Sequence, residues 1–137
     1  MNRLIARTVA TALLATSFAV AYAGDVKVSL TGDQEVPAVT SPATGTGTIT
    51  IGDDKTVKGK VTTTGVAGTM AHIHLAPVGQ NGPPVITLEK SGDNAWSVPA
   101  GSTLTDSQYQ AFKAGNLYVN VHSDAHKSGE IRAQLKP

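Results

Sequence analysis

Apolar and polar residues alternate at every second position through most of this chain. The alternating stretches are short, and clusters of glycine, proline, asparagine or aspartate separate them. Alternation of period two puts the apolar side chains on one face of a strand, and turn residues every 8–12 residues or so are typical of antiparallel sandwiches. The pattern predicts an all-β, antiparallel Greek-key β-sandwich, with strands at 26–30, 44–51, 56–64, 70–75, 85–88, 95–98, 117–122 and 129–135.

One segment, 106–113, departs from this pattern and has the features of a helix. Thr105 and Gln108 have the spacing of a capping box, in which each side chain satisfies a backbone amide of the other residue. Tyr109 and Phe112 then fall on one helical face. We expect a short structural helix that docks on the core through these two aromatic side chains.

The first 23 residues have the features of a secretory signal peptide. Arg3 and Arg7 give a positive start, an apolar run too short to span a bilayer follows, and 21–23 reads Ala-Tyr-Ala, a small-residue cleavage pattern. We expect cleavage after residue 23, which leaves 24–137 as one domain that is periplasmic or secreted. The alternative is an uncleaved anchor, although no second apolar span follows.

Composition narrows the chemistry open to this domain. Without Arg3 and Arg7 the chain has nine basic and ten acidic residues, and it has no basic patch of the kind that binds nucleic acid. It has no cysteine, which excludes thiolate metal sites and cysteine nucleophiles. A transition-metal site would therefore use imidazole and carboxylate ligands, which suit copper, with zinc as the alternative. After cleavage, Arg132 is the one remaining arginine.

All four histidines lie in two short segments. His72 and His74 share the polar face of one predicted strand, His122 lies on the polar face of another, and His126 follows four residues later. Histidine is the commonest metal ligand, and imidazoles two residues apart on a strand can converge on one metal. We predict a metal site formed by His72, His74 and His122, provided that their strands are neighbours. His126 is a fourth ligand, an outer residue or a solvated loop residue.

Each of these features also has a simpler interpretation. Exposed histidines are common without any ligand, and a short motif alone is only a hypothesis. In a simple hairpin Arg132 would lie beside His122, where its charge would attract and orient a small anion. The alternative for Arg132 is an ion pair with Glu130, Asp124 or another carboxylate.

Three motifs, in the same order along the chain, resemble the CHRD domain, which takes its name from the secreted antagonist chordin. They are Leu-Thr-Gly-Asp-Gln-Glu-Val-Pro at 30–37, Ala-His-Ile-His-Leu at 71–75 followed by Gly-Gln-Asn-Gly-Pro at 79–83, and Tyr-Val-Asn-Val-His at 118–122 leading to 129–135. The resemblance covers nearly all of 24–137. It implies an immunoglobulin-like β-sandwich and an exported protein.

The chain departs from the usual residues of this family at a few positions, and none of them removes a candidate ligand. They are Ala76, Pro84, Ala133 and the turn at 127–128. A looser similarity concerns the histidines and the nearby arginine, which are similar to the copper half of Cu/Zn superoxide dismutases. Likeness of a constellation suggests chemistry without establishing activity.

These observations lead to one hypothesis and two alternatives. The hypothesis is an exported domain that binds copper through His72, His74 and His122 and, if it is an enzyme, dismutates superoxide with Arg132 guiding the anion. The alternatives are a non-catalytic extracytoplasmic interaction module and a periplasmic copper carrier. The expected partners are thus a metal ion and a small anion, and the sequence leaves the native metal and the oligomeric state open.

Overall fold

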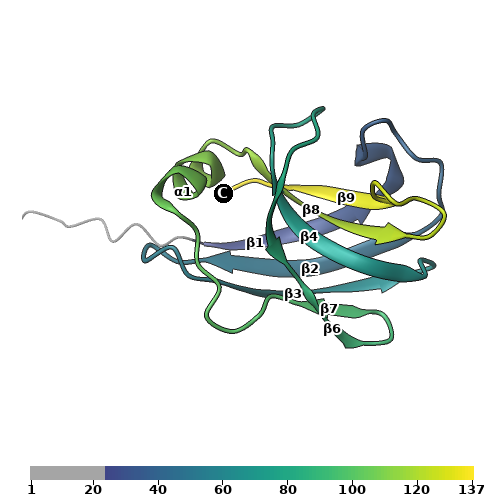
Figure 1. Cartoon of the computed structure of the whole chain (residues 1–137), viewed down its shortest axis with the longest axis horizontal. Coiled ribbons are helices and arrows are strands. Elements are labelled where there is room, and N and C mark those ends of the chain that lie inside the picture. Colours follow the sequence, from purple (N-terminus) through teal and green to yellow (C-terminus); the bar gives the residue numbers. More distant parts are fainter. Residues whose placement is uncertain (1–23) are drawn as a thin grey trace, which may run out of the picture.

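The computed structural model describes residues 24–137, which form a β-structure with one short α-helix (Figure 1). The predicted signal peptide, 1–23, lies outside the described residues. The strands are β1 (Asp25–Thr31), β2 (Thr44–Ile51), β3 (Val57–Thr64), β4 (Gly68–Leu75), β5 (Pro84–Thr87), β6 (Glu89–Gly92), β7 (Ala95–Ser97), β8 (Leu117–Ser123) and β9 (Ile131–Leu135). The helix is α1 (Asp106–Lys113), and η1 (Gly32–Gln34) is a short 3-10 turn.

The strands form one antiparallel sheet in the order β5-β4-β8-β9-β1-β2-β3-β7-β6. This sheet curls until its two ends nearly meet, because β5 at one end and β6 at the other are joined by a single residue, Leu88. There the amide of Leu88 donates to Ala71 O at 2.9 Å, and Lys90 Nζ donates to Gly68 O at 3.4 Å. The predicted all-β antiparallel class is confirmed, and a sandwich with Greek-key connections is compatible with this order.

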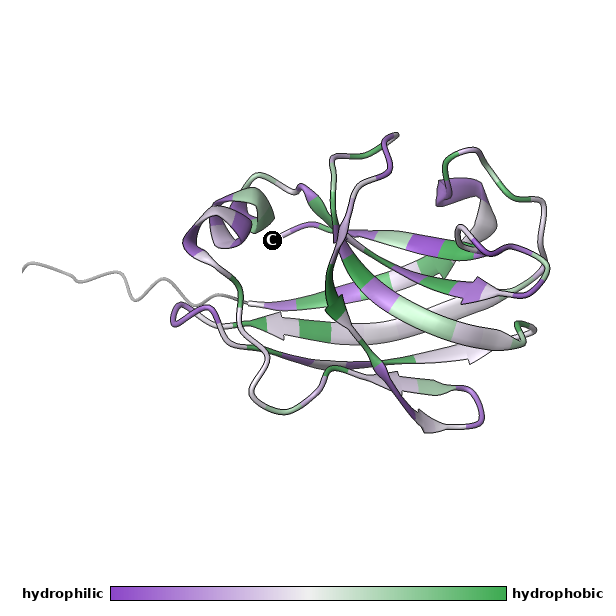
Figure 2. Ribbon diagram, in the orientation of Figure 1, coloured by the Kyte–Doolittle hydropathy of each residue, from purple (hydrophilic) through white to green (hydrophobic). Residues whose placement is uncertain are grey.

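The inner surface of the curled sheet is the hydrophobic core. Figure 2 shows the alternation of hydrophobic and hydrophilic residues along the strands. Inward residues from both halves of the sheet are fully buried, among them Leu30, Ile49, Ile51, Val61, Ile73, Val119, Val121, Ile131 and Leu135. Each such side chain contributes about 1.5–3 kcal/mol by leaving water, so the apolar faces hold the sheet closed. Trp96, 4% exposed, also belongs to this core.

The helix has the predicted bounds and the predicted cap. Thr105 Oγ1 accepts from the amide of Gln108 at 3.2 Å, and Gln108 Oε1 accepts from the amide of Thr105 at 2.9 Å. Phe112 is buried in the core, with Tyr109 partly buried against it. No helix within 24–137 is long and apolar enough to cross a bilayer.

The segment after β5 differs from the prediction. The sequence pattern predicts no strand between 85–88 and 95–98, whereas the structure has a further strand there, β6, that pairs with β7. All four residues of β6 are exposed, so its sequence has no alternation to reveal it. The buried Leu88 is the point at which the chain crosses from one end of the sheet to the other.

Candidate metal centre

Three of the four histidines meet on the outward face of two neighbouring strands. β4 and β8 pair antiparallel, with His72 opposite Asn120, His74 opposite Tyr118, and Met70 opposite His122. Ala71 and Ile73 are fully buried on the inward face, so the histidines between them must point outward. The adjacency on which the predicted site depended is therefore present.

The imidazole nitrogens have the spacing of metal ligands. One ring nitrogen from each of His72, His74 and His122 lies within 4.8 Å of the others, and His72 Nδ1 lies 3.0 Å from His122 Nε2. Nitrogens about 2 Å from one metal are about 3–4 Å apart. One pair already has this spacing, and the third ring is close enough to join it by a small side-chain rotation.

Two of the three rings are fixed by backbone carbonyls. His74 Nδ1 lies 2.9 Å from Gly82 O, and His122 Nδ1 lies 2.8 Å from Lys127 O. A carbonyl oxygen only accepts hydrogen bonds, so each ring carries its proton on Nδ1 and presents a lone pair at Nε2. Metal-binding histidines are commonly oriented by a partner of this kind.

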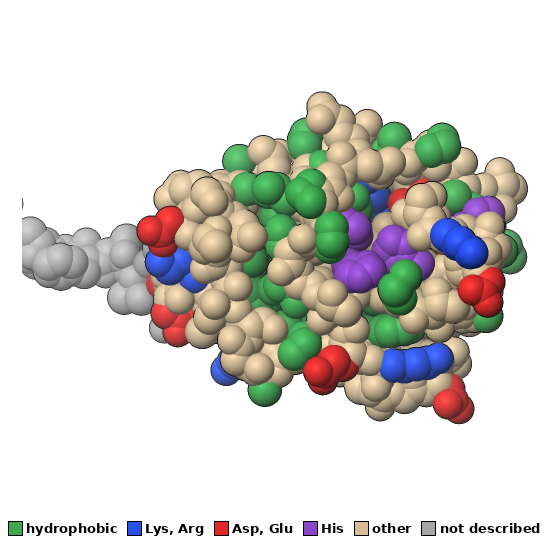
Figure 3. All heavy atoms as spheres, in the orientation of Figure 1, with side chains coloured by type: hydrophobic (Ala, Val, Ile, Leu, Met, Phe, Trp, Pro, Cys, Tyr) green, Lys and Arg blue, Asp and Glu red, His purple; other side chains and the backbone are tan. Residues whose placement is uncertain are grey.

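The chain supplies these carbonyls from two connections that fold over the outward face. Gly82 belongs to the loop between β4 and β5, and its amide donates to the Tyr118 hydroxyl at 3.3 Å. Lys127 belongs to the hairpin between β8 and β9. Under these connections His74 is 8% and His122 6% exposed, whereas His72 is half-buried. In Figure 3 most of the histidine side chains gather in one central patch that reaches the surface, and a further histidine side chain lies apart from it.

Burial favours the neutral forms of His72 and His74. It lowers the pKa of His72, and the neighbouring His122 and His74 lower it further. Burial also lowers the pKa of His74, against the opposing effect of its hydrogen bond to Gly82 O. Neutral imidazole is the form that binds a metal. His74 Nε2 is buried without a hydrogen-bond partner. A purely structural histidine would have this atom paired, whereas a metal ligand needs its lone pair free.

Arg132 lies one layer behind the histidines. It pairs across β8 and β9 with Asn120, two positions from His122, and its guanidinium carbon packs 3.5 Å from the centre of the Tyr118 ring. The Tyr118 ring in turn stacks on His74, with centroids 4.7 Å apart. Both neighbours are in contact with this one ring, so they must occupy its opposite faces. The charge of Arg132 nevertheless reaches the site, because it helps to lower the pKa of His74.

The hydrogen bonds of Arg132 fix the loop that covers the site. Nη1 donates to Gln80 O at 2.8 Å and to Asn81 Oδ1 at 3.4 Å; Nη2 donates to Pro77 O at 3.2 Å and to Gln134 Oε1 at 3.1 Å. Within 24–137 these partners are carbonyl and amide oxygens, and the expected partner Glu130 instead accepts from Ser41 and Ser123. Guidance of an anion by Arg132 stays a prediction.

His126 does not join the three other histidines. It lies half-buried in the hairpin after β8, where its backbone exchanges hydrogen bonds with Ser123. Sequence reasoning did not assign a role to Tyr118 or Asn120, although it put both on the polar face with His122. The roles of the Gly82 and Lys127 carbonyls could not be predicted from the sequence, since every residue has a backbone carbonyl.

Comparison with known proteins identifies the family and nothing closer. No curated protein and no solved structure matches the chain. The family that matches is the CHRD domain, over residues 26–135, a span that includes all three converging histidines and every strand but the first residue of β1. The chain belongs to the CHRD domain family.

Proposed function

We propose that this domain binds one copper ion through His72, His74 and His122. The observation that carries the proposal is the convergence of three imidazole nitrogens, two of them held as lone-pair donors by backbone carbonyls. An extracytoplasmic address is part of the proposal and is supported by the signal-like first 23 residues.

Copper is favoured over zinc by the chemistry of the donors. Nitrogen sites bind Cu²⁺ more tightly than Zn²⁺. Met70, on the same strand face and directly opposite His122, is 49% exposed. A thioether beside the site favours Cu(I), the softer ion.

For the activity we propose superoxide dismutation. Copper, when bound, supplies a one-electron couple: one superoxide is oxidised to dioxygen, and a second takes up that electron and two protons to form hydrogen peroxide. The half-buried ring of His72 leaves one side of the cluster open to a small anion, and the positive charge of Arg132 behind Tyr118 favours an anion there. The resemblance to the copper half of Cu/Zn superoxide dismutases supports the same activity.

Copper loading tests the site. With one equivalent of Cu(II), the protein should give an EPR spectrum with nitrogen hyperfine coupling. His74→Ala and His122→Ala should each weaken Cu(II) binding by about 100-fold or more, because the loss of one ligand exceeds the 10–100-fold effect of losing an outer partner. His126→Ala is the matched control and should bind as the unaltered protein does. Equal binding by all four proteins would rule out the site.

Kinetics separate the proposed enzyme from the alternatives. Pulse radiolysis of the copper-loaded protein should show a rate of superoxide decay that is first-order in protein and exceeds the spontaneous rate in buffer without protein. Slow decay, together with rapid transfer of copper to a chelator, would favour a copper carrier. A protein that binds no copper would be left as a non-catalytic interaction module.

A further inference from the structure

Two buried acceptors beside the proposed metal lack a hydrogen-bond donor. Within 24–137, the buried side-chain atoms that lack a partner are His74 Nε2 and Asn120 Oδ1. Asn120 is 1% exposed, so bulk water does not reach its amide. Since Asn120 is directly opposite His72, its side chain shares the outward face with the three histidines.

The two acceptors cannot satisfy each other. Asn120 is near enough to His74 to raise the pKa of that ring as a hydrogen-bonding neighbour. The proton of His74 is on Nδ1, however, where it is donated to Gly82 O, so Nε2 and Oδ1 both present lone pairs to the same region. A metal would satisfy Nε2. Oδ1 would still need a hydrogen, which a water molecule on that metal carries.

The orientation of the amide is set from its other end. Asn120 Nδ2 donates to Glu35 Oε1 and to Ser128 O, each at 3.4 Å. A flipped amide would bring Oδ1 against Ser128 O, a backbone carbonyl that cannot donate, and this contact is repulsive. Gly129 makes the arrangement compact: its φ is +128°, and a Cβ there would lie 2.4 Å from both Asn120 Nδ2 and Glu35 Oε1.

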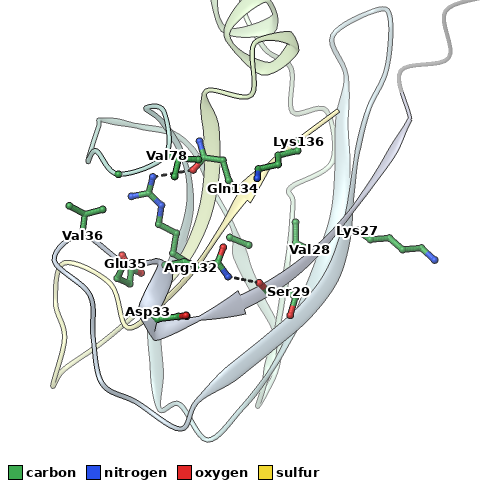
Figure 4. A pocket seen from close by; sticks show the side chains of 13 residues that line it. Lys27, Val28, Ser29, Asp33, Glu35, Val36, Val78, Arg132, Gln134 and Lys136 are labelled. Atoms are coloured by element: carbon green, nitrogen blue, oxygen red, sulfur yellow. Dashed lines mark hydrogen bonds between the residues drawn. The ribbon is translucent and has the colours of Figure 1, made fainter.

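Glu35 comes from a distant segment and has its own access to solvent. It is 5% exposed, and it lines a pocket of about 470 Å³ that has Arg132 in its wall and none of the histidines (Figure 4). Burial raises the pKa of Glu35 to about 7, although Asn120 and Arg132 both oppose the rise. Burial of an ionised Glu35 destabilises the fold. A functional role for the Asn120 amide that Glu35 holds in place would explain why a carboxyl group lies here.

We propose that Asn120 Oδ1 accepts a hydrogen bond from a water or other O–H ligand on the metal, and that Glu35 is the positioning residue that holds the amide in this orientation. The inference rests on the proposed metal site and adds a preference to it. Ligands that carry a hydrogen, such as water and hydroperoxide, are favoured at the open position. Anions that carry none, superoxide among them, bind there less tightly than they would without Asn120.

Azide, an anion without hydrogen, tests this preference on the Cu(II)-loaded protein. Asn120→Ala removes the facing lone pair, so azide should bind about three- to tenfold more tightly, as expected for the loss of one unfavourable acceptor. The measurement is an optical titration of the azide-to-copper charge-transfer band at fixed pH. Cu(II) affinity should fall much less than in His74→Ala or His122→Ala, because no ligand has changed.

Glu35 variants keep the test informative if Asn120→Ala fails to fold. Glu35→Gln retains an acceptor for Asn120 Nδ2 and should bind azide as the unaltered protein does, whereas Glu35→Leu releases the amide and should shift azide affinity toward the Asn120→Ala value. Gln34→Leu is the matched control, since Gln34 lines the same pocket but bonds only to Ser29 and Thr31.

The outcomes separate this inference from the proposed function. Unchanged azide affinity in copper-loaded Asn120→Ala, or equal affinities in both Glu35 variants and the unaltered protein, would overturn the inference alone. Failure of the unaltered protein to bind copper would contradict the proposed function and would remove the inference with it.

Discussion

The two faces of the β4–β8 pair are both largely buried, but for different reasons. On the inward face Ala71, Ile73 and Val119 pack into an apolar core without polar atoms to satisfy. On the outward face the histidines and Asn120 are covered by loops, and two acceptors there lack donors. An unpaired buried acceptor costs about 1–3 kcal/mol. The inward face thus stabilises the fold, whereas the polar site on the outward face destabilises it.

The largest expected effect is on the inward face. Ile73→Ala should lower the free energy of unfolding by about 2–5 kcal/mol, because it removes a fully buried side chain and leaves a cavity. Copper affinity of the folded fraction should stay nearly unchanged, since no histidine is touched. Denaturant unfolding and copper titration measure the two quantities. A large loss of copper affinity without a loss of stability would show that the faces are not separable.

A smaller effect of opposite sign is expected for Glu35. Its pKa is near 7 in the folded chain against an ordinary 4.5, so the folded state binds more protons between these values and stability falls as pH rises through this window. Glu35→Gln should remove that loss and stabilise the protein by on the order of 2 kcal/mol at pH 8. At pH 4.5 the variant and the unaltered protein should be nearly equal.

Unfolding curves at several pH values provide the measurement for Glu35→Gln. Glu89→Gln, at an exposed position on β6, is the control and should leave the pH profile unaltered. A pH profile of Glu35→Gln parallel to that of the unaltered protein would mean that Glu35 ionises freely in the fold.

The smallest effect should come from the loop anchor. Tyr118→Phe removes the hydroxyl that accepts from the amide of Gly82, which should cost about 0.5–1.5 kcal/mol of stability. The ring that stacks on His74 is retained. Because Gly82 O orients His74, we also expect a several-fold loss of Cu(II) affinity. Thr50→Val, which removes a hydroxyl bonded to Asp25 far from the site, serves as the control. A loss of stability in Tyr118→Phe without any loss of Cu(II) affinity would show that the loop does not contribute to metal binding.

Much of this contrast could be predicted from sequence because strands and helix caps are local patterns. Alternation located eight of the nine strands, and Thr105 and Gln108 located the helix. The clustering of His72, His74 and His122 suggested the site. β6 was missed because all of its residues are exposed, so no apolar period marks it.

The burial of the outward face could not be predicted in the same way. Every residue of β8 is buried, on both faces, although its alternation suggested a strand with one solvated side. The cover comes from loops whose positions depend on tertiary contacts, such as those of Arg132 with the carbonyls of Gln80 and Pro77. Glu35 reaches Asn120 across 85 positions of sequence, a separation that no local pattern encodes.

A crystal structure of the copper-loaded protein tests the central claim most directly, because the claim specifies atoms. We predict one copper ion about 2.0–2.1 Å from His74 Nε2, His122 Nε2 and His72 Nδ1, with the Nδ1 atoms of His74 and His122 still bonded to Gly82 O and Lys127 O. Copper bound elsewhere on the domain, or held by fewer than two of these histidines, would contradict the account.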